Sequence, residues 1–188
     1  MCSSDLVELF MSTSASALSG IMAGVATPRI NPLSLSDLLH AMRLSVEALP
    51  LLRVEPNNTT ARMNLVAASF LSNRALDAMR GRAFGLISSL GHVLDTLYTH
   101  ISHGDASTLT TSWVMRFNLE QTSSGLARLA RELGVANGLP EKEAAARAPD
   151  FIDDFYRKLG MPVRLSDANI PLEGIERIAD DAMGDFYL

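Results

Sequence analysis

Cysteine is almost absent from the sequence, since Cys2 is the single one among 188 residues. A disulfide scaffold is therefore excluded, and a lone thiol near a chain end is a poor candidate for a nucleophile. Basic runs are also missing, and the formal net charge is −5. This charge balance argues against nucleic acid or an anionic membrane as the main partner.

Common catalytic motifs are missing as well. The sequence has no glycine-rich phosphate loop, nucleophile elbow, His-Glu-x-x-His motif or cysteine pair. Its hydrophobic content of 47% excludes intrinsic disorder. No linker, internal repeat or low-complexity segment divides the chain, and one domain is the default at this length. We therefore expect a single domain over residues 1–188.

Residues 9–28 carry no charged side chain, over about the length of a membrane span. Six of these residues are serine or threonine, and the lysine or arginine that precedes the apolar part of a signal peptide is missing. We therefore expect a buried helix, no membrane partner and a cytoplasmic location. Gly20 and Gly24 would share one face of this helix and allow a neighbouring helix to approach closely.

Apolar residues recur every three or four positions along the rest of the chain, which is typical of amphipathic helices. The expected helices cover residues 35–49, 63–71, 84–98, 106–118, 121–133, 141–159 and 172–183. Pro50 is expected to stop the first of them, and Gly134, Gly138 and Gly160 to end later ones. No run alternates with period two, so we predict an all-α fold, a single multi-helix bundle.

Three of the four histidines, His92, His100 and His103, fall within twelve residues; the fourth is His40. Such a cluster is compatible with a metal site or an acid–base pair. His100 and His103 would share a helical face if the helix extended that far. The alternative is a turn in which the imidazoles cap backbone groups and face water.

Several segments resemble a known family. Residues 91–98 (GHVLDTLY), 102–106 (SHGDA) and 114–118 (VMRFN) are similar to the helical C-terminal domain of iron-containing alcohol dehydrogenases and maleylacetate reductases, in the dehydroquinate synthase-like superfamily. Weaker matches extend the resemblance over nearly the whole chain. The resemblance implies a multi-helix domain and a catalytic metal held by one aspartate and three histidines.

The sequence departs from that family at the implied metal ligands. The resemblance places them at Ser16, Gly20, Ser88 and His103, of which only His103 is a metal-ligating residue type. One ligand cannot hold a divalent metal, so we expect no metal. The family's nucleotide-binding domain would precede this sequence, and no dinucleotide motif is present, so we expect no cofactor. The resemblance also implies that one face of the helical domain packs against the nucleotide-binding domain. Left uncovered, this face would be an exposed apolar patch, which predicts a homodimer.

The first functional hypothesis is a repurposed enzyme that performs non-redox chemistry in the old cleft. It would cyclise, isomerise or eliminate an apolar small molecule of secondary metabolism. His92 matches the family's active-site histidine that is not a ligand, and it would donate or accept a proton. His103, Tyr98 and Asp95 would assist it; the simpler alternatives are core packing for Tyr98 and a surface carboxylate for Asp95. The expected substrate-binding residues are Ser16, Gly20, Ser88, His100 and Trp113.

Two other hypotheses remain open: a catalytically inactive binding module, and the C-terminal half of a split dehydrogenase or maleylacetate reductase. The small residues at the former ligand positions leave space, which favours a retained pocket. The acidic residues near the C-terminus, Glu173, Glu176, Asp180, Asp181 and Asp185, are expected to form a solvated helix face.

Overall fold

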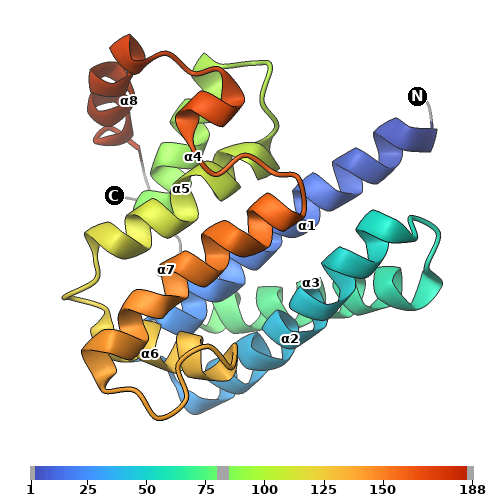
Figure 1. The fold of residues 1–188 in the computed structure, drawn as a ribbon, viewed down its shortest axis with the longest axis vertical. Coiled ribbons are helices and arrows are strands. Elements are labelled where there is room, and N and C mark those ends of the chain that lie inside the picture. The colour runs from blue at the N-terminus through green and yellow to red at the C-terminus, as the bar shows by residue number, and fades with distance from the viewer. Residues whose placement is uncertain (1–2, 80–84, 186–188) are drawn as a thin grey trace.

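The computed structural model describes residues 3–79 and 85–185, and within these residues all regular elements are helical (Figure 1). The long helices are α1 (Ser3–Ala26), α2 (Pro32–Val54), α3 (Thr59–Ala78), α4 (Gly85–Leu97), α5 (His103–Phe117), α6 (Ser123–Glu132), α7 (Glu141–Lys158) and α8 (Ile175–Ala182). Two short 3-10 helices, Leu165–Ala168 and Leu172–Gly174, lie between α7 and α8. The predicted all-α class is confirmed. Cys2 and Phe84 lie outside the described residues.

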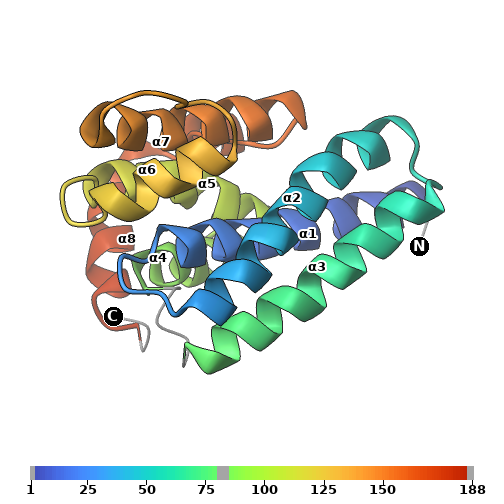
Figure 2. The same ribbon diagram turned by 90° about the horizontal axis from the view of Figure 1, so that it is seen from below.

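Helix α1 is the centre of the bundle. It packs against α2, α3, α5 and α6, and lies between the α2–α3 and α6–α7 pairs (Figure 2). The large side chains of Leu18, Ile21 and Met22 are fully buried there. The segment Leu6–Ala26 is long and apolar enough to cross a membrane by length and composition alone, yet half of its most apolar stretch is buried inside the protein. Packing therefore accounts for its apolar composition.

Local residue choices begin and end the helices. The side chains of Asn31 and Asn58 cap α2 and α3 by accepting backbone N–H groups at 2.9 Å. Gly134 and Gly160 follow α6 and α7 with φ angles of 76° and 74°, a left-handed conformation that suits glycine. The predicted glycine stops are confirmed at these two positions.

The predicted stop at Pro50 is wrong. Helix α2 continues through this residue to Val54, and Pro50 itself is exposed. Leu49 and Leu52, on either side, are almost fully buried in the core. Burying each leucine contributes about 1.5–3 kcal/mol, which offsets the backbone hydrogen bond that proline cannot make.

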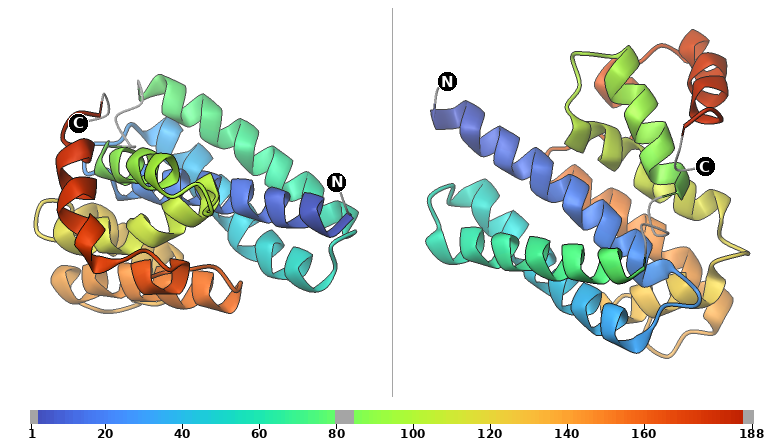
Figure 3. Two further views of the ribbon diagram at one scale, coloured as in Figure 1. Left: turned by 90° about the horizontal axis from the view of Figure 1, so that it is seen from above. Right: turned by 180° about the vertical axis from the view of Figure 1, so that it is seen from behind.

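A second, smaller core holds the C-terminal segment to the bundle. It joins Leu94 of α4 and Leu109 of α5 to Ile170 and Ile178, which follow α7 in the sequence. Helix α8 consequently lies beside α4, at one end of the molecule (Figure 3). Residues of α4, of the start of α5 and of the turn after α8 meet at this end.

Candidate active site

The fold brings together two of the predicted catalytic histidines. His92 lies in the middle of α4, and His103 is the first residue of α5. Their rings are stacked, with centroids 6.0 Å apart and an interplanar angle of 26°. Ser102 caps α5 through a reciprocal hydrogen-bonded box with Asp105, which fixes where the helix begins. Helix α5 therefore starts three residues earlier than the sequence predicted, and its first turn presents His103 to α4.

Each of the two histidines has a carboxylate at Nδ1. For His103 this is Asp95, with 2.6 Å between Nδ1 and Oδ2. For His92 it is Asp185, at 2.9 Å. An ionised carboxylate only accepts hydrogen bonds, so each contact requires the ring proton on Nδ1 when the imidazole is neutral. Each pair is thus set to exchange protons through Nε2, the nitrogen that does not face the carboxylate.

The two pairs differ in their exposure to water. The side chains of His92 and Asp185 are 32% and 11% exposed, whereas those of His103 and Asp95 are 56% and 26% exposed. Solvent screens the attraction between charged groups and competes for their hydrogen bonds. The His92–Asp185 pair is therefore the more firmly held of the two.

The implied metal-ligand positions are engaged in other contacts or carry no ligating group. The Oγ atoms of Ser16 and Ser107 lie 3.0 Å apart in a hydrogen bond between α1 and α5. Gly20 is buried within α1, and Ser88 is partly buried on α4. Within the described ranges, no group of three or more histidine, cysteine, aspartate or glutamate side chains is arranged to hold a metal ion. The donors at the four implied positions, one imidazole and two hydroxyls, do not fit iron.

Tyr98 and His100 have contacts of a different kind. The Tyr98 hydroxyl lies against Gly174, and the rings of Tyr98 and His100 are nearly perpendicular, with centroids 6.1 Å apart and an interplanar angle of 81°. Nε2 of His100 donates a hydrogen bond to the carbonyl of Ala168 at 2.9 Å. Because α4 ends at Leu97, His100 and His103 do not share a helical face. The His100 ring therefore binds a backbone carbonyl, as the alternative interpretation of the histidine cluster describes, and its role in substrate binding stays a prediction.

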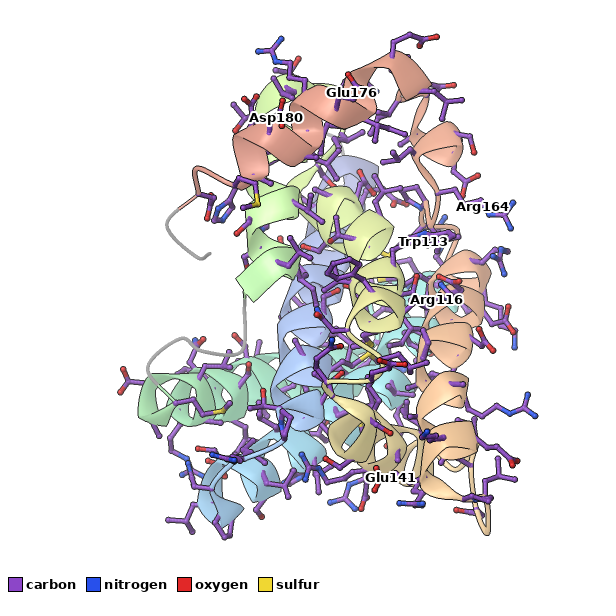
Figure 4. All side chains as sticks on the ribbon, turned by 90° about the vertical axis from the view of Figure 1, so that its left-hand side faces the viewer. Trp113, Arg116, Glu141, Arg164, Glu176 and Asp180 are labelled. Carbon is purple, nitrogen blue, oxygen red and sulfur yellow. The ribbon has the colours of Figure 1, made fainter. Side chains whose placement is uncertain are left out.

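Trp113, the remaining predicted substrate-binding residue, lies on the side of α5 that faces α7 (Figure 4). Its side chain is half exposed, and the indole N–H donates to the carbonyl of Val163 at 3.2 Å. The guanidinium of Arg116 lies over the ring, 5.1 Å from its centroid. These contacts link α5 to the segment after α7 and do not involve the paired histidines.

Asp185 and Ser89 are site residues that the sequence did not predict. Asp185 lies 93 positions from His92, and the sequence predicts it on a solvated acidic face. This prediction is wrong for Asp185, whose side chain is mostly buried, whereas Asp180 and Asp181 are exposed as expected. The Ser89 hydroxyl donates to the other carboxylate oxygen of Asp185 at 3.3 Å. No local periodicity marks either residue, because their contact is formed by the docking of α8 on α4.

Comparisons with known proteins define the class of this domain. The family described as Fe-containing alcohol dehydrogenase family, C-terminal, matches residues 10–188. The chain therefore belongs to this family, as the resemblance in the sequence predicted. It is 29% identical to the maleylacetate reductase of Burkholderia cepacia over 140 residues, covering 74% of this chain and 36% of that protein. Identity to the NAD-dependent methanol dehydrogenase of Bacillus methanolicus is 25% over 178 residues, covering 94% and 46%.

Solved structures show the same fold. The fold matches a 1,3-propanediol oxidoreductase with a TM-score of 0.85 and 25% identity, over 96% of this chain and 47% of that one. An alcohol dehydrogenase from Oenococcus oeni matches with a TM-score of 0.86 and 23% identity, over 96% and 46%. The chain thus spans less than half the length of the relatives it matches.

Proposed function

We propose that this domain supplies the substrate-binding and proton-transfer half of an alcohol dehydrogenase or carbonyl reductase. This is the split-enzyme alternative, with the nucleotide-binding half supplied by polypeptide outside residues 1–188. Its relatives are named as dehydrogenases and reductases, which supports oxidation and reduction over non-redox chemistry. The observation that carries the proposal is the pair of stacked histidines, His92 and His103, each with a carboxylate at Nδ1.

The reaction needs a group that moves a proton at the substrate oxygen. Reduction of a carbonyl adds a hydride to carbon and a proton to oxygen, and oxidation of an alcohol reverses both. Hydride transfer is the chemistry that a nicotinamide nucleotide supplies when bound, and this sequence has no phosphate-binding loop for one. His92 would donate or accept the proton, a role typically worth about 10²–10⁴-fold in rate. His103, whose ring is stacked on that of His92, would hydrogen-bond the same substrate oxygen.

Iron has no role in this proposal. The positions that the resemblance assigns to metal ligands hold Ser16, Gly20 and Ser88, whose side chains offer no imidazole or carboxylate. Because Nδ1 keeps its proton toward the carboxylate, the histidine would have to be doubly protonated, so that its Nε2–H donates the hydrogen bond that polarises the substrate carbonyl.

Non-redox chemistry on an apolar substrate is the second candidate. The loss of the metal donors at Ser16, Gly20 and Ser88 favours it, because a site without a Lewis acid suits proton transfer alone. His92 would then move a proton without any hydride transfer. Consumption of nicotinamide nucleotide separates the two candidates.

The test joins this chain to the nucleotide-binding half of the Burkholderia cepacia maleylacetate reductase and follows NADH and NADPH oxidation with maleylacetate and short aldehydes. We expect turnover that resists a metal chelator and falls by about 100-fold or more in His92→Ala. His40→Ala, which changes an exposed histidine on α2, is the matched control and should leave turnover unchanged.

If the folded chimera binds NADH but oxidises none with these substrates, the proposal is wrong. Conversion of an apolar compound without nucleotide consumption would support the non-redox candidate instead. A chimera that folds and binds NADH but converts none of the compounds would favour the inactive binding module.

A further inference from the structure

We infer that Asp185 is a positioning residue for His92, and that α8 acts as a strap that delivers it to the site. In this role the carboxylate fixes the orientation of the His92 ring and keeps the proton of the neutral ring on Nδ1. The effect on catalysis rests on the proposed function, whereas the effect on the ring itself does not.

Both oxygens of the Asp185 carboxylate are bound by α4. Oδ2 lies 2.9 Å from Nδ1 of His92, and Oδ1 accepts the Ser89 hydroxyl at 3.3 Å. Ser89 and His92 are three residues apart, so they lie on the same face of the helix. The carboxylate therefore contacts two successive positions of that face, which restricts its rotation and that of the ring it holds.

The Asp185 carboxylate is also mostly removed from water. Its side chain is 11% exposed, and a carboxylate is desolvated in this way only where hydrogen bonds or opposite charge compensate it. The other acidic side chains of α8, Glu176, Asp180 and Asp181, are exposed (Figure 4 labels the first two). Of the charged residues along α8 and the turn that follows, it is thus Asp185 that turns inward.

Apolar contacts hold the strap in place. Ile178 and Ala182, four residues apart on one face of α8, are 6% and 1% exposed. Ile178 belongs to the second core, with Leu94 of α4 and Leu109 of α5. The chain turns after Ala182, where α8 ends, and this turn returns Asp185 to the His92 side of α4. The docking of α8 and the orientation of His92 are therefore coupled.

The second pair provides an internal comparison. Asp95 lies only eight residues from His103, so that pair needs no distant segment to form, and it is more exposed. A carboxylate at Nδ1 selects one imidazole tautomer and holds the ring at a fixed angle, as the aspartate of a serine-protease triad does for its histidine. Loss of Asp185 should therefore change the tautomer of His92 and leave the tautomer of His103 unchanged.

The first test is nuclear magnetic resonance of the whole chain with isotope-labelled histidine, recorded at alkaline pH where imidazoles are neutral. His92→Gln identifies the signals of His92. We expect the His92 proton on Nδ1 in the wild type, and a mixture of tautomers or a predominant Nε2 proton in Asp185→Ala. Asp180→Ala, an exposed aspartate on the same segment, should match the wild type.

A His92 proton on Nε2 in the wild type overturns the inference without any variant, so a failure of Asp185→Ala to fold does not leave it undecided. An unchanged tautomer in folded Asp185→Ala also overturns it. Ser89→Ala keeps the carboxylate at His92 and should retain the wild-type tautomer.

The second readout uses turnover of the chimera. We expect Asp185→Ala to lower kcat by about 100-fold through misplacement of the ring, with KM changed by less than about twofold. Asp185→Glu, which keeps the carboxylate, should recover part of this loss, and Asp180→Ala should have no effect. Full activity in His92→Ala would refute the proposed function but leave the tautomer result standing. Full activity in Asp185→Ala, with activity lost in His92→Ala, would refute the inference alone.

Discussion

Replacing Gly104 with alanine tests the close contact of α1 and α5 that places His103. A Cβ atom at this position would lie 2.2 Å from the carbonyl oxygen of Ser12 and 2.5 Å from its carbonyl carbon. These are backbone atoms of α1, so they cannot rotate out of the way. The two helices would have to separate locally by about 1 Å to restore an ordinary contact distance.

The cost of this separation follows from what the two helices share. The hydroxyls of Ser12 and Ser102 lie 2.8 Å apart, and those of Ser16 and Ser107 lie 3.0 Å apart. Both hydrogen bonds would be stretched beyond their normal range, at about 1 kcal/mol each. Overpacking adds about 1–3 kcal/mol, and the better helix propensity of alanine returns at most about 1 kcal/mol. We expect the free energy of unfolding to fall by about 2–4 kcal/mol.

Urea denaturation followed by circular dichroism measures this change, and thermal unfolding should show a midpoint lower by roughly 5–10 °C for a domain of this size. Gly91→Ala is the matched control, because a Cβ atom there meets no other atom within 4 Å. It should leave the domain as stable as before, or stabilise it by up to about 1 kcal/mol. Gly104→Ala with wild-type stability would show that α1 and α5 are not in the contact described.

Two further substitutions test other parts of the bundle. Tyr156→Phe removes the buried hydroxyl that bonds Ser19 at 2.9 Å and the Ala15 carbonyl at 3.1 Å, and should cost about 1–2 kcal/mol in urea denaturation at neutral pH. Burial raises the pKa of Tyr156 above its ordinary value of 10.0. Above pH 10 the unfolded chain therefore binds fewer protons than the folded chain. The free energy of unfolding of the wild type consequently falls as the pH rises. Unfolding measured over an alkaline pH series should show a shallower fall in Tyr156→Phe, and equal slopes would contradict the burial of this phenol. Pro50→Ala should raise the free energy of unfolding by about 1–2 kcal/mol, because it restores a donor within α2; a loss of stability would mean that the helix does not continue through this residue.

The sequence predicted features that depend on local rules. The ends of α6 and α7 follow from Gly134 and Gly160. The start of α5 follows from a serine cap with an aspartate three residues later, a local signal that the predicted start at residue 106 did not use. Pro50 was predicted wrongly because the burial of its neighbours in the tertiary structure outweighs a local preference. Local rules therefore located most helices, and failed where packing opposes them.

The candidate site was only partly predictable. The resemblance indicated His92 and His103, and the spacing of eight residues between Asp95 and His103 crosses a single turn. The partner of His92 could not be predicted in this way. His92 and Asp185 are 93 residues apart, and no pattern in the sequence connects them. Asp185 is an aspartate like its exposed neighbours Asp180 and Asp181, so residue type alone does not show that it turns inward. Only the docking of α8 on α4 distinguishes it.

The central position of α1 has a consequence for how the chain folds. Its partners come later in the sequence: Ser19 bonds Tyr156 across 137 residues, and Arg128 binds the Val25 carbonyl across 103. The α2–α3 and α6–α7 hairpins, by contrast, are built from neighbouring helices and can form early. During synthesis α1 can pack against α2 soon after both leave the ribosome, but α5 and α6, which also cover it, begin only at His103 and Ser123. We expect nascent chains that end before α5 to depend on chaperones and to aggregate when released without them.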